Sequence, residues 1–291
     1  TLGSQWRVLP VPDDGSGGPH EFVSETAGEE RRRQLVGRYL PEPRWNVRIA
    51  TFEGDVAERA EEWRVFVTKA GQILRTEHTL PEARPGATLD ENAARERAVA
   101  IVARDFSLDI AGGTLREVSA RPAKRKARTD WTFTFVDASL PPLPQGEPRI
   151  AVEIAGDEVT VVRRFVFVPE QWERQQRATS TRNLIVRIIV GVVFGGLLVS
   201  AAVAGVVAWS RRRYTPRLFL AATGIMFAVT LAAAANSWPS SQARFVTEIP
   251  LPIQLLGAVG IGLVALVINS ALAGLALGAQ PARLEGSGTL P

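Results

Sequence analysis

The 291-residue chain contains no cysteine, which excludes disulfides, thiolate catalysis and cysteine metal sites. It has only two histidines, His20 and His78, so a zinc site would need mostly carboxylate ligands. Basic residues exceed acidic ones by a formal charge of only +4, and they are scattered along the chain. This excess is too small for a nucleic-acid surface, so we predict no nucleic-acid partner.

Hydropathy divides the chain into two unlike halves. The mean hydropathy of the whole chain is close to zero, at +0.04. Residues before about Arg182 are nevertheless rich in Arg, Glu, Asp and Pro, whereas those after it are mostly Val, Leu, Ala, Gly and Ile. We therefore expect a soluble region followed by a membrane region.

Three apolar segments are long enough to cross a bilayer, which takes about 20 helical residues. They cover residues 184–209, 218–235 and 251–278. Their only charged residue is Arg187, which lies within a turn of the start of the first segment, where its side chain can reach the interface. These segments predict three transmembrane helices and make the lipid bilayer a partner of the protein.

The placement of arginine predicts how these helices are oriented. Residues 210–217 hold four arginines and no acidic residue, whereas residues 236–250 hold only Arg244 and Glu248 as charges. Short cytoplasmic loops carry an excess of basic residues, so we expect residues 210–217 in the cytoplasm. The soluble region is then expected outside, on the periplasmic side of a bacterial inner membrane.

The soluble region repeats one order of elements. Each pass has a helix and then antiparallel strands with alternating apolar residues, and each ends in an apolar residue followed by Pro-Glu. Asp90 is the expected N-cap of the second helix. The predicted elements are a helix over 28–40 with strands over 45–52, 63–68 and 72–79, then a helix over 90–106 with strands over 114–120, 131–136, 149–154 and 158–167. The predicted fold class is an α+β soluble region of two helix-plus-antiparallel-sheet modules, followed by an all-α region of three transmembrane helices.

These patterns define a domain organisation. The modules are expected over 28–86 and 87–170, and residues 171–183 are expected to form a helical stalk that continues into the first membrane helix. Because residues 12–19 are rich in Gly, Pro and Asp, we expect 1–27 to be a flexible N-terminal segment. Residues 279–291 are typical of a flexible linker. The start without Met and this linker-like end lead us to expect a piece of a longer protein.

A search for reactive side chains finds no catalytic, cofactor-binding or metal-binding residue. His20 in the Gly/Pro-rich segment and His78 at a strand end are expected to be ordinary surface or edge histidines. The acidic pairs Glu29-Glu30 and Glu61-Glu62 are expected on solvated helix faces. The chain lacks a Gly-x-Ser-x-Gly elbow, a Ser-x-x-Lys motif and a phosphate-binding loop.

Two further patterns have simple explanations. The basic run over residues 121–128 has the charge to bind anionic lipids or nucleic acid, but a solvated hairpin loop between two strands is the better interpretation. Small residues recur four apart in the membrane segments, and this spacing allows helices to approach closely. The pairs are Gly191 with Gly195, Ala201 with Gly205, and Gly274 with Gly278.

Several segments resemble a known family. They are the strand over 129–135, the hairpin over 149–159, the segment over 164–174 and the Asn-Ser-Trp-Pro sequence over 236–239. Together they are similar to the N-terminal half of long bacterial CPBP-family intramembrane metalloproteases, which are relatives of CAAX prenyl endopeptidases. The soluble modules resemble PepSY-like or cystatin-like folds.

The catalytic motifs of that family are missing from the chain. The resemblance implies Glu-Glu-x3-Arg, Phe-x3-His and His-x3-Asn/Asp on membrane helices. Here Glu29-Glu30 lies in the soluble region with Gln34 where Arg should stand, and no Phe-x3-His occurs. No catalytic residue is carried over, and the resemblance implies that a protease core follows Pro291.

Two hypotheses about function follow. The first is an extracytoplasmic sensing or regulatory region, with its membrane anchor, of a CPBP-type protease. The second is a stand-alone, non-enzymatic membrane protein whose PepSY-like modules bind a peptide or inhibit a protease in trans. A transporter or channel subunit is disfavoured, because intramembrane proton relays need acidic residues or histidines that these segments lack.

Overall fold

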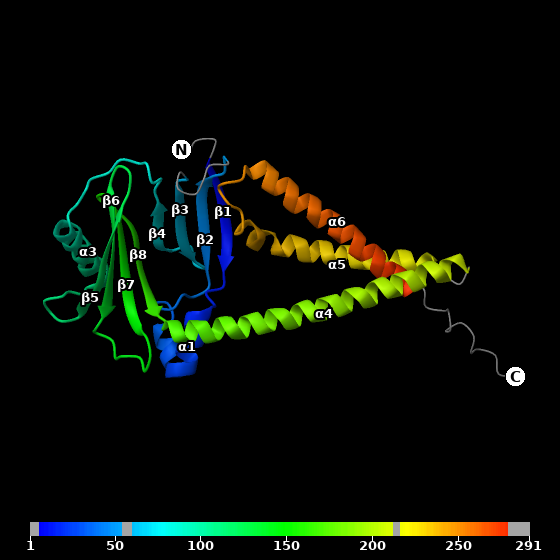
Figure 1. The fold of residues 1–291 in the computed structure, drawn as a ribbon, viewed down its shortest axis with the longest axis horizontal. Helices are drawn as coiled ribbons and strands as arrows, with labels where there is room; N and C mark the ends of the chain where they lie inside the picture. Colours follow the sequence, from blue (N-terminus) through cyan, green and yellow to red (C-terminus); the bar gives the residue numbers. More distant parts are fainter. Residues whose placement is uncertain (1–5, 54–59, 212–215, 279–291) are drawn as a thin grey trace. The chain divides into compact units, whose positions relative to one another are not determined.

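The structure is a computed structural model and describes residues 6–53, 60–211 and 216–278. The chain divides into two compact units. Thr1–Gln176 and Pro239–Leu251 form the first, which we call the sheet unit, and Arg177–Trp238 and Pro252–Pro291 form the second, which we call the helical unit. This architecture confirms the predicted α+β region followed by three long apolar helices (Figure 1).

The first sheet of the sheet unit has four antiparallel strands in the order β1-β2-β3-β4. The strands are β1 (Trp6–Asp13), β2 (Arg44–Thr51), β3 (Glu62–Thr68) and β4 (Ile73–Thr79). Three of the four match predicted strands within one or two residues. The tight turn between β3 and β4 contains Gly71 at a positive φ of 82°, a conformation that favours glycine.

The second sheet also has four antiparallel strands, in the order β5-β6-β7-β8. They are β5 (Leu115–Lys124), β6 (Thr129–Asp137), β7 (Glu147–Ala155) and β8 (Glu158–Phe167), and each contains or overlaps a predicted strand. Alternate residues on β6 and β7 are buried, including Phe133, Phe135, Ile150 and Val152 at 0% exposure. This alternation is the pattern of a sheet with one face in a core.

Three helices of the sheet unit share the core of the second sheet. They are α1 (Gly18–Ala27), α2 (Glu29–Leu35) and α3 (Glu91–Phe106). The side chain of Asp90 accepts a hydrogen bond from Ala93 N at 2.8 Å, which confirms the expected N-cap of α3. The buried residues that these helices and the segment after α2 contribute to this core are Phe22, Val23, Leu35, Tyr39, Leu40, Ala94, Ala98 and Val102.

The first predicted module, over 28–86, does not keep its helix with its own sheet. The helix expected over 28–40 ends at Leu35, and its buried residues join the core of the second sheet. A short helix of seven residues gains little from its own hydrogen bonds, so tertiary packing decides where it lies.

The N-terminal segment is also structured, so the expectation of a flexible segment is wrong for residues 6–13 and 18–27. β1 carries Pro10 and Pro12, which are tolerated because β1 is an edge strand. Pro19 lies in the first turn of α1, where a missing N–H costs nothing. Phe22 and Val23 of α1 are fully buried.

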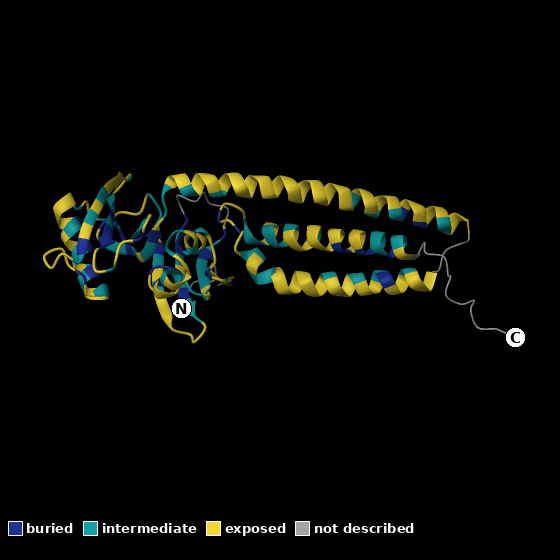
Figure 2. Ribbon diagram, turned by 90° about the horizontal axis from the view of Figure 1, so that it is seen from below, coloured by how far each residue is buried: buried dark blue, intermediate teal, exposed yellow. Residues whose placement is uncertain are grey.

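The helical unit contains most of three long helices: α4 (Glu170–Ser210), α5 (Pro216–Gln242) and α6 (Leu251–Gly278). Each is long and apolar enough to cross a membrane. Their apolar side chains are largely exposed (Figure 2), which is the expected state of lipid-facing helices. α4 is one uninterrupted helix of 41 residues, so the predicted stalk does continue into the first membrane segment.

Small residues mark where these helices meet. A Cβ added at Gly205 of α4 would overlap the carbonyl oxygen of Leu275 in α6, and one added at Gly274 would overlap the Thr223 hydroxyl of α5. In contrast, no atom lies within 4 Å of a Cβ added at Gly191 or Gly195. Gly205 and Gly274, one member of each of two predicted pairs, therefore lie at helix contacts, whereas Gly191 and Gly195 do not.

Candidate functional site

The sheet unit contains a cleft between its two sheets. The edge strands β4 and β8 lie side by side (Figure 1) and open into a cavity of about 280 Å³, completed by residues 37–44 and the end of α3. Four arginines line it, and Glu42 is the only acidic residue of the lining. We call this cavity the arginine cleft; its arginines are Arg44, Arg75, Arg163 and Arg164.

Two of these arginines stack on one buried ring. The guanidinium carbons of Arg44 and Arg75 lie 4.6 and 4.0 Å from the centroid of Phe66, which is 5% exposed. Arg44 also pairs with Asp13 at 2.8 Å. Such contacts hold the planar guanidinium in place and leave some of its N–H groups for a ligand.

The positive charge of the cleft is only partly balanced. Arg75 Nε lies 2.9 Å from Glu77 Oε1, but without hydrogen-bond geometry. Among the described residues, no carboxylate lies within ion-pair distance of Arg163, whose guanidinium stacks 5.2 Å from the ring of Phe165. Burial, and the positive charges of Arg44 and Arg163, lower the pKa of Arg75.

Arg164 lies on the face of β8 opposite Arg163, since successive side chains of a strand point to opposite faces. Its guanidinium lies 4.7 Å from the ring of Phe106 and 5.5 Å from that of Tyr39, and burial lowers its pKa. Tyr39 donates a hydrogen bond of 2.5 Å to Asp137 Oδ2. This buried pair fixes the segment that follows α2 against the second sheet.

A second contact joins the edge strands β4 and β8. His78 of β4 is 5% exposed and stacks on Trp63 with ring centroids 3.6 Å apart. Its Nδ1 lies 2.5 Å from Glu158 Oε1 in β8, and its Nε2 lies 2.8 Å from Glu61 Oε1. The contact with Glu158 joins β4 of the first sheet to β8 of the second, and the contact with Glu61 joins β4 to the segment before β3.

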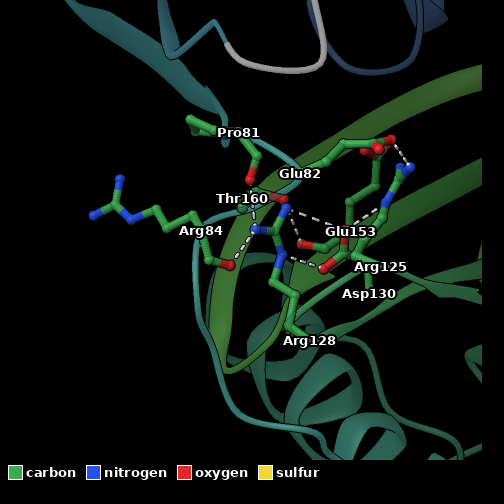
Figure 3. A network of polar contacts seen from close by, with 8 residues as sticks. All are labelled: Pro81, Glu82, Arg84, Arg125, Arg128, Asp130, Glu153 and Thr160. Atoms are coloured by element: carbon green, nitrogen blue, oxygen red, sulfur yellow. Dashed lines mark hydrogen bonds and ion pairs between the residues drawn. The ribbon is translucent and has the colours of Figure 1, made fainter.

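The segment after β4 is held by an arginine of the basic run (Figure 3). Arg128 donates to the carbonyls of Pro81 and Arg84 at 2.7 and 2.8 Å, and to Asp130 Oδ1 at 2.7 Å. Arg125 pairs with Asp130 and also with Glu82. A buried guanidinium with three such acceptors fixes the link between the two sheets.

The loop between α5 and α6 belongs to the sheet unit. Arg48 of β2 forms a bidentate ion pair with Glu62 at 2.9 and 2.7 Å, and its third nitrogen donates to the carbonyl of Phe245 at 2.7 Å. Leu251 N donates to Phe52 O at 3.2 Å. The loop is thereby bound to the first sheet through its main chain.

Several sequence expectations about single residues are wrong. Glu62 is a buried strand residue and not part of a solvated helix face, whereas His78 does lie on an edge strand, β4, and is buried there. His20 lies in α1, with Nε2 2.8 Å from Pro41 O. The basic run is not simply a solvated hairpin loop, since Arg128 is 5% exposed.

The pair Glu29-Glu30 does lie on an exposed helix face, as expected. The carboxylates pair with Arg32 and Arg33 one turn further along α2. The hydrogen bond from Arg32 is the main cause that lowers the pKa of Glu29 to about 2. These contacts account for the pair without a ligand.

Within the described ranges, no three His, Asp or Glu side chains converge on a point that would hold a metal ion. His78 and its two carboxylates do not form such a site, because the carboxylates bind opposite nitrogens of the ring. No protein-family model, curated protein or solved structure matches this chain.

Proposed function

We propose that the chain is the extracytoplasmic sensing or regulatory region, with its membrane anchor, of a CPBP-type intramembrane metalloprotease in a bacterial inner membrane. One observation carries the regulatory part of the proposal. The chain passes between the sheet unit and the helical unit three times, in α4, at the end of α5 and at the start of α6.

Through these three connections, a ligand that binds the sheet unit can affect the membrane helices. The first sheet binds the α5–α6 loop through Arg48 and Phe52. Helix α4 is attached through Trp172, whose ring centroid lies 5.4 Å from that of Phe22 and whose Nε1 donates a hydrogen bond of 2.9 Å to Glu25. A shift between the two sheets therefore moves chain segments that continue into all three helices. A ligand regulates a protein in this way if it binds one arrangement of the two sheets more tightly than another.

The charge distribution supports the extracytoplasmic side. The α5–α6 loop folds with the sheet unit, so the two lie on the same side of the membrane. If all three helices span the membrane, the arginine-rich residues 210–217 lie on the opposite side. The excess of arginine favours the cytoplasm for residues 210–217. The family assignment is supported by the resemblance of residues 129–135, 149–159, 164–174 and 236–239.

Single cysteines test the orientation, since the chain contains no native thiol. Ile73, which is 69% exposed, and Arg211, which is exposed, are replaced by Cys in separate variants. A membrane-impermeant maleimide is expected to label position 73 in intact cells and position 211 only after permeabilisation. The reverse pattern contradicts the extracytoplasmic assignment.

The gene sequence tests the family assignment. The proposal expects coding sequence after Pro291 with paired Glu and His motifs on apolar helices. A stop codon at that point, or several hundred codons without those motifs, contradicts a protease and favours a stand-alone binding protein. A pull-down that recovers a separate peptidase would support that alternative.

A further inference from the structure

We propose that the arginine cleft binds a small molecule that carries a phosphate or carboxylate group next to an apolar group. This inference names the ligand class of the proposed sensing region. It rests on the proposed function only for its biological role, because binding in the cleft is measurable whichever side of the membrane the sheet unit faces.

The charged part of the ligand is indicated by Arg75 and Arg163. Both guanidinium groups line the cavity, and Arg163 has no carboxylate within ion-pair distance among the described residues. Like charges at close range are unfavourable unless an anion lies between them. A phosphate or carboxylate accepts two parallel N–H bonds from one guanidinium, which makes it the matching group.

Stacking fixes these guanidinium groups before a ligand arrives. Arg75 lies over Phe66, and Arg163 lies over Phe165. A side chain that is already held in place loses less entropy when it binds an anion. The half-buried Arg75 side chain and the exposed Arg163 side chain are thus both oriented by an aromatic ring before a ligand binds.

The apolar part of the ligand is indicated by the rest of the lining. Leu74 and Phe165 line the cavity, and Leu74 is 45% exposed. A large aliphatic side chain that lies open beside cationic groups favours a ligand with both characters. The volume of about 280 Å³ limits the ligand to a small molecule or to one group of a larger one.

Calorimetric titration of the full chain in uncharged detergent, at constant ionic strength, tests this assignment. The probes are phenyl phosphate, benzoate, inorganic phosphate and phenol. Phenyl phosphate and benzoate are expected to saturate with Kd on the order of 1 mM, and phosphate and phenol to bind at least roughly tenfold more weakly. Dioctanoyl phosphatidic acid carries the same phosphate on a lipid, so tighter binding of this probe identifies a membrane source, and weaker binding a soluble one.

Three variants locate the site. Arg163→Gln is expected to weaken phenyl phosphate binding by roughly tenfold, because a charged hydrogen-bond donor is lost. Arg121→Gln removes the same charge from an exposed position on β5, the far edge of the sheet, and is expected to leave Kd unchanged. Glu42→Gln removes the acidic residue of the lining and is expected to tighten binding by roughly threefold.

The opposite signs of these variants exclude a folding defect as the explanation. The proposal is overturned if neither phenyl phosphate nor benzoate saturates by about ten times the expected Kd. It is also overturned if Arg163→Gln and Arg121→Gln weaken binding equally. A negative titration does not change the labelling expected at positions 73 and 211. The ligand proposal and the extracytoplasmic assignment can therefore be rejected independently.

Discussion

Arg48 in β2 donates a hydrogen bond of 2.7 Å to the main-chain carbonyl of Phe245, which lies 197 positions further along the sequence. The same guanidinium is held by both oxygens of the Glu62 carboxylate. Glu62 is 8% exposed, so the pair is largely shielded from water and from salt. One arginine thus links the first sheet to the loop between α5 and α6.

Glu62 should make this link sensitive to acid. Burial raises the pKa of Glu62, but the hydrogen bonds from Arg48 and Arg64 outweigh burial and lower it below the ordinary value of 4.5. A carboxylate with a lowered folded-state pKa stabilises the fold above about pH 4.5 and loses that effect as pH falls through the lowered value.

We expect Glu62→Gln to reduce the free energy of unfolding at pH 7 by about 2–3 kcal/mol, because two arginines lose a charged partner. When the pH is lowered below 4.5, the free energy of unfolding should fall less in the variant than in the wild type. Guanidinium unfolding followed by tryptophan fluorescence at pH 7 and pH 4 measures both. Glu30→Gln, at a 77% exposed side chain, is the control and should resemble the wild type.

Tyr39 gives the opposite prediction at high pH. Burial and the hydrogen bond to Asp137 raise the pKa of the Tyr39 phenol above its ordinary value of 10. The unfolded phenol then ionises first, so the free energy of unfolding should fall as pH rises above about 10. Tyr39→Phe should cost about 1–2 kcal/mol at pH 7 and flatten this alkaline decline.

Ser139→Ala is the matched control, since Ser139 is the other side-chain donor to Asp137, at 2.5 Å. It should lower stability at pH 7 but keep the alkaline decline of the wild type. Equal alkaline slopes in Tyr39→Phe and wild type would show that the buried phenol is not the titrating group.

The contact between α4 and α6 depends on a glycine. Gly205→Ala should destabilise the helical unit by about 1–3 kcal/mol, because the added methyl group overlaps the backbone of Leu275. Gly191→Ala lies in the same helix with open space around it, and it should be neutral or stabilising by up to about 1 kcal/mol. Thermal unfolding in lipid nanodiscs compares the two, and similar effects would contradict the packing of α4 on α6.

Arg128 should be the most sensitive position of the basic run. Its side chain is 3% exposed and holds the carbonyls of Pro81 and Arg84. Arg128→Met should cost about 3–4 kcal/mol, since two carbonyls lose their donor and Asp130 loses one of its two arginine partners. Arg121→Met, at an exposed site in β5, should cost less than about 0.5 kcal/mol.

Local patterns in the sequence predicted most of the individual elements. Alternating apolar residues identified seven of the eight strands, and Asp90 marked the start of α3, because burial on one face and helix capping act over a few residues. β1 was missed because Pro10 and Pro12 are typical of linkers. Its place at a sheet edge, which makes them acceptable, depends on residues about 35 positions away.

The candidate site was not predicted from the sequence. The arginine cleft joins residues of β2, β4 and β8, and nothing in the local pattern of Arg75 or Arg163 indicates that they converge. His78 and Glu158 are 80 positions apart, so their contact follows only from the packing of two sheet edges. The sequence offered one general signal: a charged residue in a strand, such as Glu62 before Trp63, needs a partner if that strand position is buried.

The central claim is that the sheet unit holds the α5–α6 loop, and hydrogen exchange of the full chain in nanodiscs tests it most directly. Wild type is compared with Arg48→Met and with Arg64→Met, because Arg64 also pairs with Glu62 but is 45% exposed and has no bond to the loop. The amides of Phe245 and Leu251, which donate to Gln242 O and Phe52 O, should be protected in wild type and Arg64→Met and exchange at least about tenfold faster in Arg48→Met. Fast exchange in wild type, or equal rates in all three proteins, would contradict the account.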